Sequence, residues 1–264
     1  MGAPLADAVL PATDRPPISP NALILLVAWI ASGAALALLP EAAGPLTFAF
    51  VVLGWIAAVV VHEFGHAFTA HKAGDPTIVE KGYLTLDPLK YADLGTSIVI
   101  PVIALVLGGI GFPGGAVYLR EDMMRSRAWR SLASLAGPAG TFVVLIALGF
   151  GIHLAAPALP GGAANPLVPA LAFLAFLQAT ALVLNLLPVP GLDGFGILRP
   201  WLPQGVRDKL RPIEGIAMLA LLALLFFVPF AARLFFGVAL LFTDLLALPR
   251  ELIQSGWDSF KFWT

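Results

Sequence analysis

Several stretches of about 20 residues in this 264-residue chain carry almost no charged side chains. An α-helix rises about 1.5 Å per residue, so a stretch of that length crosses the roughly 30 Å hydrocarbon core of a bilayer. Hydrophobic residues make up 59% of the chain and charged residues only 12%, about half of the charged fraction of a soluble domain. The sequence therefore excludes a soluble globular fold and predicts an all-α, polytopic membrane protein.

The composition excludes further classes of function. The net charge is −1, and no cluster of Lys and Arg is large enough for a phosphate-binding patch, so no nucleic-acid partner is expected. The chain contains no cysteine, which excludes disulfides, thiol nucleophiles and cysteine-ligated metals. Any metal must therefore be held by histidine and carboxylate side chains.

The apolar runs divide the chain and cover residues 21–39, 46–70, 94–112, 131–156, 166–187 and 215–247. Residues 1–20 are rich in Pro and Ala and are expected to form a disordered tail. The last run is too long for one span and needs a break near Pro229, so it crosses the membrane once or twice. Because no interval between runs has room for a soluble domain, we predict one integral membrane domain over residues 21–250, with about six spanning helices, and a short C-terminal tail at residues 251–264.

The second apolar run contains the sequence HEFGH, which places His62 and His66 four residues apart. On a helix this spacing puts both imidazoles on one face, where they can bind one zinc ion, and Glu63 lies beside them to act on a water that the metal activates. Ionisable side chains near mid-bilayer each cost at least about 2.5 kcal/mol to insert, so a function or tight pairing must compensate. The alternative interpretation is a helix end whose His and Glu side chains hydrogen-bond to neighbouring spans.

A catalytic zinc ion usually has three protein ligands, so a third is expected elsewhere in the chain. A histidine six residues after His66 would extend the motif, but that residue is Lys72. Glu80 is interpreted as a solvated loop charge, and His153 as a side chain hydrogen-bonded within the bundle. Asp193 is the preferred candidate, because prolines and glycines around it break the helix, and unwound backbone at membrane depth usually lines a cavity. The alternative is an ordinary interfacial turn with a capping aspartate.

Three motifs resemble the site-2 protease family of intramembrane zinc metalloproteases. They are HEFGH within a span, AGP in SLAGPAGT, and N-x-x-P-x-P-x-x-D-G at the end of a later span. The resemblance covers the chain from about residue 59 to residue 199. It implies that His62, His66 and Asp193 bind one zinc ion per chain and that Glu63 is the general base or acid.

The chain departs from the family pattern at two places. The family often continues AGP-x-x-N, but the corresponding residue here is Thr141, whose hydroxyl is still able to hydrogen-bond a substrate. Some relatives carry N-P-x-x-H-x-D before the third apolar run, where this chain has Asp87 and Tyr91, so a role for that histidine does not carry over. Thr141, Asn185, which opens the last motif, and Thr85 are candidate substrate-binding residues.

A substrate helix hides its carbonyls in its own hydrogen bonds, so the scissile stretch must be unwound and held extended. Residues 77–86 contain β-prone runs on either side of Glu80-Lys81-Gly82 and predict a small β-hairpin near the active site. An exposed edge of this hairpin, including Thr85, would pair with the unwound substrate. A hairpin with a purely structural role is the alternative.

These features predict a zinc-dependent intramembrane endopeptidase in the lipid bilayer, whose substrates are membrane proteins with a transmembrane helix. One alternative is a non-catalytic membrane protein of the same fold that binds a metal or a client helix. A metal transporter is disfavoured, because its pathway would place polar groups on several spans, and here they converge on one site.

The zinc ligands meet only if the two spans that carry them run in the same direction, which requires an odd number of crossings between them. We therefore expect residues 94–117, which contain Pro101 and a glycine-rich stretch, to be re-entrant rather than spanning. With that assignment the Lys and Arg side chains of the connections gather on one side, which predicts that the site faces the cytoplasm at the plasma membrane. If residues 215–247 cross twice, both termini are cytoplasmic.

Overall fold

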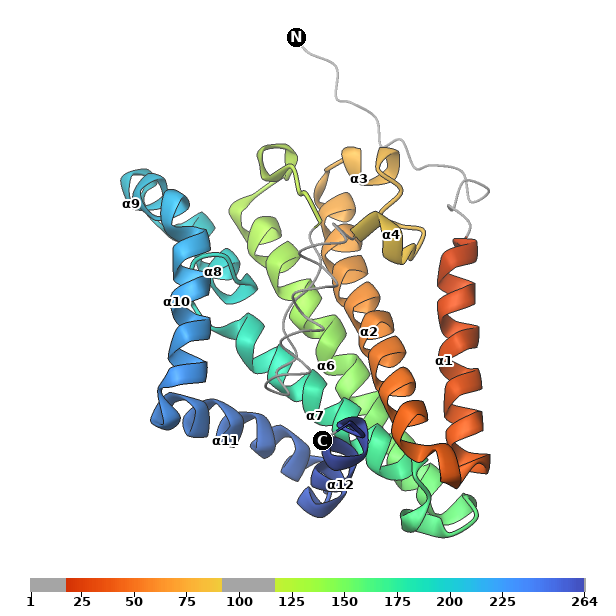
Figure 1. Cartoon of the computed structure of the whole chain (residues 1–264). Helices are drawn as coiled ribbons and strands as arrows, with labels where there is room; N and C mark the ends of the chain where they lie inside the picture. The colour runs from red at the N-terminus through yellow and green to blue at the C-terminus, as the bar shows by residue number, and fades with distance from the viewer. Residues whose placement is uncertain (1–17, 92–116, 264) are drawn as a thin grey trace.

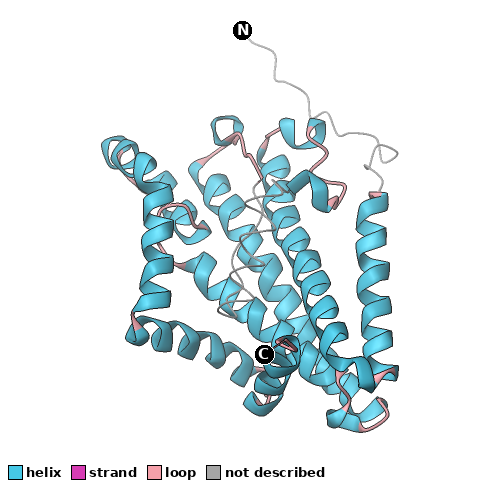
Figure 2. Ribbon diagram, viewed as in Figure 1, coloured by secondary structure: helices cyan, strands magenta, loops and turns pink. Residues whose placement is uncertain are grey.

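The computed structural model describes residues 18–91 and 117–263, and within these ranges it is built of helices without strands (Figures 1 and 2). The helices are α1 Pro20–Leu38, η1 Pro40–Ala42, α2 Ala43–Ala73, α3 Thr77–Glu80, α4 Pro88–Tyr91, η3 Glu121–Met123, α6 Arg127–Ala158, η4 Gly162–Ala164, α7 Leu167–Leu186, α8 Asp193–Leu198, η5 Arg199–Trp201, α9 Gln204–Leu210, η6 Arg211–Ile213, α10 Glu214–Phe227, α11 Pro229–Leu245 and α12 Arg250–Phe260. Five helical stretches are long and apolar enough to cross a membrane, or up to six if the bent pair of α11 and α12 is one span. The prediction of an all-α, polytopic membrane protein with about six spans is confirmed.

Helices α2, α6 and α7 form the centre of the molecule (Figure 1). α2 and α7 run in the same direction, and α6 packs against both in the opposite direction. α7 carries apolar residues on all its faces, which suits a helix enclosed by others. Of its most apolar stretch of 18 residues, 78% is buried inside the protein. The core between these helices includes Phe50 and Val51 of α2, Leu145 of α6, and Phe173 and Leu174 of α7.

Small residues bring α2 and α6 into close contact beside the HEFGH motif. A Cβ on Gly65 would overlap the backbone of Ala136, and a Cβ on Gly140 would lie 3.0 Å from the carbonyl oxygen of Val61. Helices in a membrane associate through such close van der Waals packing, because lipid is as apolar as the side chains. The separation of the two helices is therefore fixed next to the motif.

α2 ends at Gly74, whose φ of +115° lies in the left-handed region that favours glycine. The Asp75 side chain then accepts hydrogen bonds from both the N–H and the hydroxyl of Thr77, and α3 follows at once. The predicted β-hairpin over residues 77–86 is therefore wrong. Its first half is a helical turn, because the aspartate satisfies a free backbone donor at the start of the turn, and this outweighs the weak β-propensity of the run around Ile78.

The predicted re-entrant segment, residues 94–117, lies outside the described residues except for its last one. Its two flanks lie at the same end of α2. There the Tyr91 hydroxyl donates a hydrogen bond to the carbonyl of Tyr83, and the Lys81 ammonium donates one to the carbonyl of Tyr118. The described residues on both sides of the segment therefore lie at one end of the bundle.

The long apolar region 215–247 breaks at Pro229, as predicted, because α10 ends at Phe227 and α11 begins at the proline. α11 then lies at a steep angle to α10, across the lower part of the bundle in Figure 1. It is held there by α7, where Phe236 stacks on Phe176 with ring centroids 6.1 Å apart. The second half of the region therefore does not return along the first half.

The residues expected to form a short C-terminal tail carry α12, which packs into the core. Phe260 is fully buried and stacks on Phe48, near the start of α2, with ring centroids 5.1 Å apart. At the other end of α2, the Ser19 N–H at the start of α1 donates to the carbonyl of Thr85. The described chain thus begins and ends at opposite ends of α2. The expectation of two cytoplasmic termini applied only if residues 215–247 cross the membrane twice.

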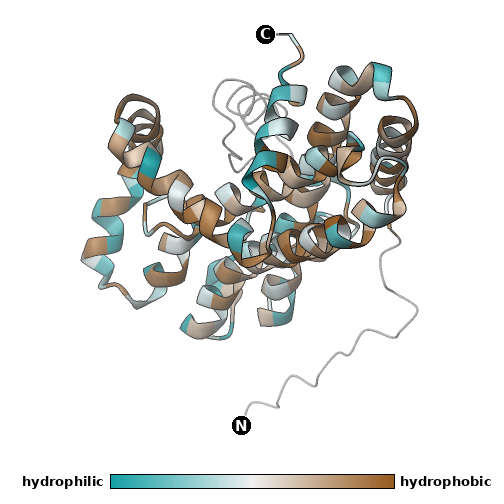
Figure 3. Ribbon diagram, turned by 90° about the horizontal axis from the view of Figure 1, so that it is seen from below, coloured by the Kyte–Doolittle hydropathy of each residue, from teal (hydrophilic) through white to brown (hydrophobic). Residues whose placement is uncertain are grey.

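Large apolar side chains are exposed along the outer helices. Phe150 and Leu154 of α6 are 64% and 75% exposed, and Leu219 and Phe227 of α10 are 68% and 82% exposed. The ribbon in Figure 3, seen from below and coloured by hydropathy, shows hydrophobic residues along many of the helices. Soluble monomers rarely expose apolar surface on this scale, so the surface is suited to lipid.

Candidate metal centre and active site

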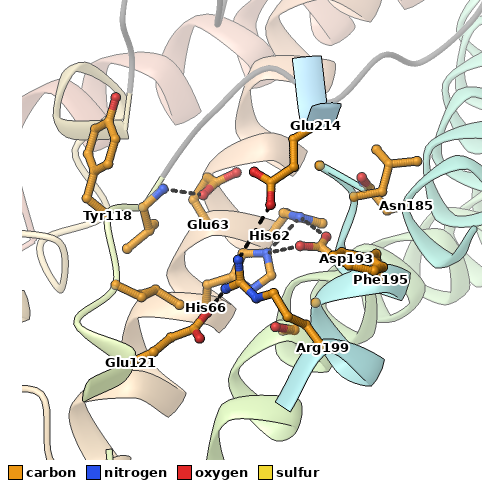
Figure 4. Close-up of a pocket in the computed structure, with 16 residues that line it drawn as sticks. His62, Glu63, His66, Tyr118, Glu121, Asn185, Asp193, Phe195, Arg199 and Glu214 are labelled. Atoms are coloured by element: carbon orange, nitrogen blue, oxygen red, sulfur yellow. Dashed lines mark hydrogen bonds and ion pairs between the residues drawn. The ribbon is translucent and has the colours of Figure 1, made fainter. Parts of the chain in front are cut away.

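Three potential metal ligands converge from two elements of the fold (Figure 4). His62 and His66 project from α2, and Asp193 is the first residue of α8. His62 Nε2 lies 3.1 Å from both His66 Nε2 and Asp193 Oδ2, and His66 Nε2 lies 3.3 Å from Asp193 Oδ1. The structure thus brings together the three residues that the sequence singled out as ligands.

The spacing of these atoms fits a zinc ion. Tetrahedral zinc with bonds of about 2.0–2.1 Å to nitrogen and oxygen holds its ligand atoms about 3.3 Å apart. The separation of the two Nε2 atoms, 3.1 Å, is close to this value, and each nitrogen lies 3.1 or 3.3 Å from one of the two Asp193 oxygens. Two imidazoles with one carboxylate are a common ligand set of catalytic zinc. Among the described residues, no other group of three His, Asp or Glu side chains could hold a metal ion.

Each imidazole is oriented by a hydrogen bond at its other ring nitrogen. His66 Nδ1 lies 2.7 Å from the carbonyl oxygen of Ala133. Because a carbonyl only accepts, Nδ1 carries the proton, and Nε2 keeps the lone pair that a metal needs. His62 Nδ1 lies 2.9 Å from the hydroxyl oxygen of Thr141, which can accept in the same way. Both partners belong to α6, so this helix fixes the two rings.

The AGP motif of α6 lies directly against the imidazoles. A Cβ on Gly137 would overlap Nε2 of His66 and would lie 2.6 Å from Nε2 of His62. No side chain fits at such distances, so the position requires glycine. This contact gives a physical reason for a motif that the sequence connects to the family by resemblance alone.

The unwound backbone predicted before Asp193 is confirmed. α7 ends at Leu186, and the connection to α8 contains Gly191 with a φ of +98°. Gly194, in the first turn of α8, packs so closely on the carbonyl of Leu186 that a Cβ would overlap it. The connection therefore turns the aspartate back over the end of α7 and toward α2.

A cavity of about 500 Å³ opens beside the three ligands (Figure 4). Glu63 is buried on its wall, and its Oε2 accepts a hydrogen bond of 3.1 Å from the backbone N–H of Val117. This bond holds the carboxylate in place beside the ligands. Further lining residues are Tyr118, Leu119, Glu121, Ser134, Asn185, Gly191, Leu192, Phe195, Gly196, Arg199 and Glu214.

The three candidate substrate-binding residues have different surroundings. Asn185 lines the cavity, whereas Thr141 is buried against His62 and does not line it. Thr85 does not line the cavity, and its N–H and hydroxyl both donate to the carbonyl of Gly82. An N–H that is already hydrogen-bonded is not free to pair with a substrate. The predicted substrate-binding role of Thr85 depended on the hairpin and is not supported.

Three other histidine and acidic residues that the sequence analysis mentions lie outside the metal centre. His153 Nε2 lies 2.8 Å from the carbonyl oxygen of Leu246, as expected for a hydrogen bond within the bundle. Glu80 is exposed on α3. Asp87 accepts hydrogen bonds from the side-chain amide of Asn21, so it joins α1 to the loop after α2.

Three charged residues on the cavity wall were not anticipated from the sequence. Arg199 forms an ion pair with Glu121, and its Nη1 lies 3.8 Å from Glu214 Oε1. The three residues belong to η5, η3 and α10. The sequence contains many basic residues near this end of the apolar runs, and only the tertiary structure distinguishes the one that faces the site.

Comparison with known proteins identifies the family of this chain. No protein-family model and no solved structure matches the chain. A Mycolicibacterium smegmatis protein named "Putative zinc metalloprotease Rip2" is 41% identical over 95% of this chain and 96% of its own length, and the Mycobacterium tuberculosis protein of the same name is 41% identical over 95% and 97%. A Bacillus subtilis protein named "Putative zinc metalloprotease YwhC" is 29% identical over 66% of this chain and 79% of its own length. The chain therefore belongs to the site-2 protease family of intramembrane zinc metalloproteases.

Proposed function

We propose that this protein cleaves transmembrane helices of other membrane proteins, with His62, His66 and Asp193 as the zinc ligands and Glu63 as the residue that transfers protons. One observation carries the proposal. The Nε2 atoms of His62 and His66 lie 3.1 Å apart, and each lies within 3.3 Å of one carboxylate oxygen of Asp193, on the wall of a cavity that Glu63 also lines. A protein that only stores metal has no need of an acid–base group held beside the ligands, whereas hydrolysis requires one.

Zinc, when bound, supplies Lewis acidity, which polarises a peptide carbonyl and lowers the pKa of a water molecule. The chain's own residues supply positioning and proton transfer. The Glu63 carboxylate, held by the N–H of Val117, accepts the proton of the attacking water at Oε and delivers it to the departing amine. His62 and His66 keep their Nε2 lone pairs aimed at one point, because α6 holds the opposite side of each ring.

The stretch Val117–Arg120 is suited to hold the unwound substrate, in place of the rejected hairpin. It is neither helix nor turn, and its second and fourth residues are hydrogen-bonded to the loop after α2. Val117 and Leu119 alternate with these two residues along the chain. Both line the cavity, and the backbone N–H and carbonyl of Leu119 have no partner within the described residues. An extended substrate can therefore pair with this edge by β-augmentation.

We place the site at the cytoplasmic face of the plasma membrane. Lys and Arg are concentrated on the cytoplasmic side of membrane proteins. The connections at the far end, residues 40–42 and 159–166, contain neither, although α11 adds Arg233 and α12 adds Arg250 and Lys261 there. The basic residues at the site end are Lys72, Lys81, Lys90, Arg120, Arg125, Arg127, Arg130, Arg199, Arg207, Lys209 and Arg211.

The test uses purified protein in lipid nanodiscs and a synthetic transmembrane peptide. We expect one zinc ion per chain and cleavage of the peptide. Glu63→Gln should keep the zinc and lose cleavage by at least about a hundredfold, because the ligands remain while proton transfer is removed. Asp193→Ala should lose both zinc and cleavage.

The matched control is Glu80→Gln, which removes an exposed carboxylate at the same end of the molecule but outside the cavity. It should keep full zinc content and activity. Full zinc content and activity in Asp193→Ala would contradict the ligand set. Stoichiometric zinc without cleavage of any helical peptide would favour the non-catalytic alternative.

A further inference from the structure

The cavity wall carries a charged triad that the proposed chemistry does not use. Glu121 comes from η3, Arg199 from η5 and Glu214 from the start of α10, and all three line the cavity (Figure 4). Their side chains are 32% to 35% exposed. The triad therefore faces both water and whatever occupies the cavity.

The guanidinium of Arg199 is not shared equally by the two carboxylates. It donates a hydrogen bond to Glu121 Oε1. Its closest approach to Glu214, from Nη1 to Oε1, is 3.8 Å, which is too long for a hydrogen bond. No other side chain or N–H in the described ranges donates to the Glu214 carboxylate. Glu214 thus presents acceptor oxygens to the cavity without a donor.

The triad has one negative charge in excess, because two carboxylates face one guanidinium. In a partly buried site the attraction between opposite charges a few ångströms apart is several times larger than in bulk water. The wall at Glu214 is therefore complementary to a cation that carries N–H donors. Lysine and arginine side chains have both properties.

Membrane-protein substrates carry such cations at the level of the membrane where the cavity is proposed to lie. Membrane-spanning segments carry Lys and Arg just beyond their cytoplasmic ends, and the proposed orientation puts the cavity on that side. A cavity of about 500 Å³ is about 10 Å across, which corresponds to about three residues of extended chain. A basic residue near the scissile bond is thus within reach of the wall.

We propose that Glu214 is a specificity-determining residue, which binds a Lys or Arg side chain of the substrate within about three residues of the scissile bond. Arg199 competes for Glu214 in the free enzyme and stays paired with Glu121 when the substrate binds. The inference rests on the proposed function, since it names a class of substrate for the same site.

The test compares synthetic transmembrane peptides that differ at one residue, which is Lys, Gln or Glu. That residue is scanned over three positions on each side of the cleaved bond. At one or more positions the wild type should favour Lys over Gln by about fivefold in kcat/KM, mainly through KM, as expected for a favourable half-exposed ion pair. Glu214→Gln should bring the ratio near one, and Glu214→Lys should favour the Glu peptide. Glu80→Gln, with its carboxylate outside the cavity, should keep the wild-type ratio.

A binding measurement separates this inference from the catalytic proposal. The dissociation constants of the same fluorescent peptides are measured in a Glu63→Gln background, with and without the changes at Glu214, so that no cleavage is required. The same order of Lys over Gln over Glu, lost in the doubly substituted protein, supports the inference even if no peptide is ever cleaved. Equal binding of the Lys and Gln peptides at every position, or a preference for Glu, would overturn it even if cleavage is efficient.

Discussion

The two walls of the active-site cavity are built in different ways. On the wall formed by α2 and α6, glycines bring the backbones into contact, and each buried histidine of α2 is hydrogen-bonded to α6. On the wall formed by η3, η5 and α10, half-exposed ion pairs make the contacts. Only 6% of the apolar stretch that includes α10 is buried, compared with 39% for α2 and 28% for α6. Dense packing thus sets the positions of the imidazoles, and the loosely packed wall leaves room for a substrate.

The largest effect is expected where the dense wall touches the ligands. Gly137→Ala places a methyl group on the Nε2 atoms of His66 and His62, so zinc should be lost and cleavage should fall by at least about a hundredfold. Gly151→Ala is the control, because it lies on the same helix with nothing within 4 Å of the added atom. Zinc content and peptide cleavage are measured for both. Normal zinc content in Gly137→Ala would refute the packing explanation of the AGP motif.

A second comparison tests dense packing away from the site. Gly256→Ala in α12 would push a methyl group into the carbonyl of Pro169 in α7, so the free energy of unfolding should fall by about 2–3 kcal/mol. Gly237→Ala in α11 has open space around the added atom and should leave stability unchanged or slightly higher. Denaturant unfolding in detergent micelles measures both. Equal stabilities would mean that α12 is only loosely attached.

Thr141→Val should have an intermediate effect. Valine keeps the shape of the side chain but removes the hydroxyl that faces His62 Nδ1, so the dissociation constant for zinc should rise by about 10–100-fold. Thr141→Ser keeps the hydroxyl and should stay close to the wild type. Competition with a zinc chelator measures the constants. If the valine variant binds zinc as tightly as the serine variant, the hydroxyl does not orient the ring.

The smallest effect is expected on the loosely packed wall. Arg199→Gln removes the ion pairs with Glu121 and Glu214, but the side chains are about one-third exposed. The free energy of unfolding should therefore change by less than about 1 kcal/mol, since solvent screens such pairs. The same denaturant assay applies. A loss as large as that of Gly256→Ala would show that this wall is as structural as the opposite one.

The sequence predicted those features that depend on local constraints. Hydrocarbon limits both the length and the charge of a span, so the apolar runs, the break at Pro229 and the unwound backbone before Asp193 could be identified without a structure. Two histidines four residues apart share a helix face whatever surrounds them. The β-hairpin was mispredicted because β-propensity depends strongly on context, and the Asp75 side chain accepts the N–H of Thr77, the first residue of the helical turn.

Only the tertiary structure decided which residues support and surround the ligands. Thr141 and Ala133 bond to imidazoles that lie 79 and 67 residues away in the chain, and no local pattern encodes such pairs. The packing of α12 on α7 and the place of Arg199 and Glu214 on the cavity wall are of the same kind. The physical reason is that a contact between distant segments depends on how whole helices pack side by side, which the periodicity of one helix does not specify.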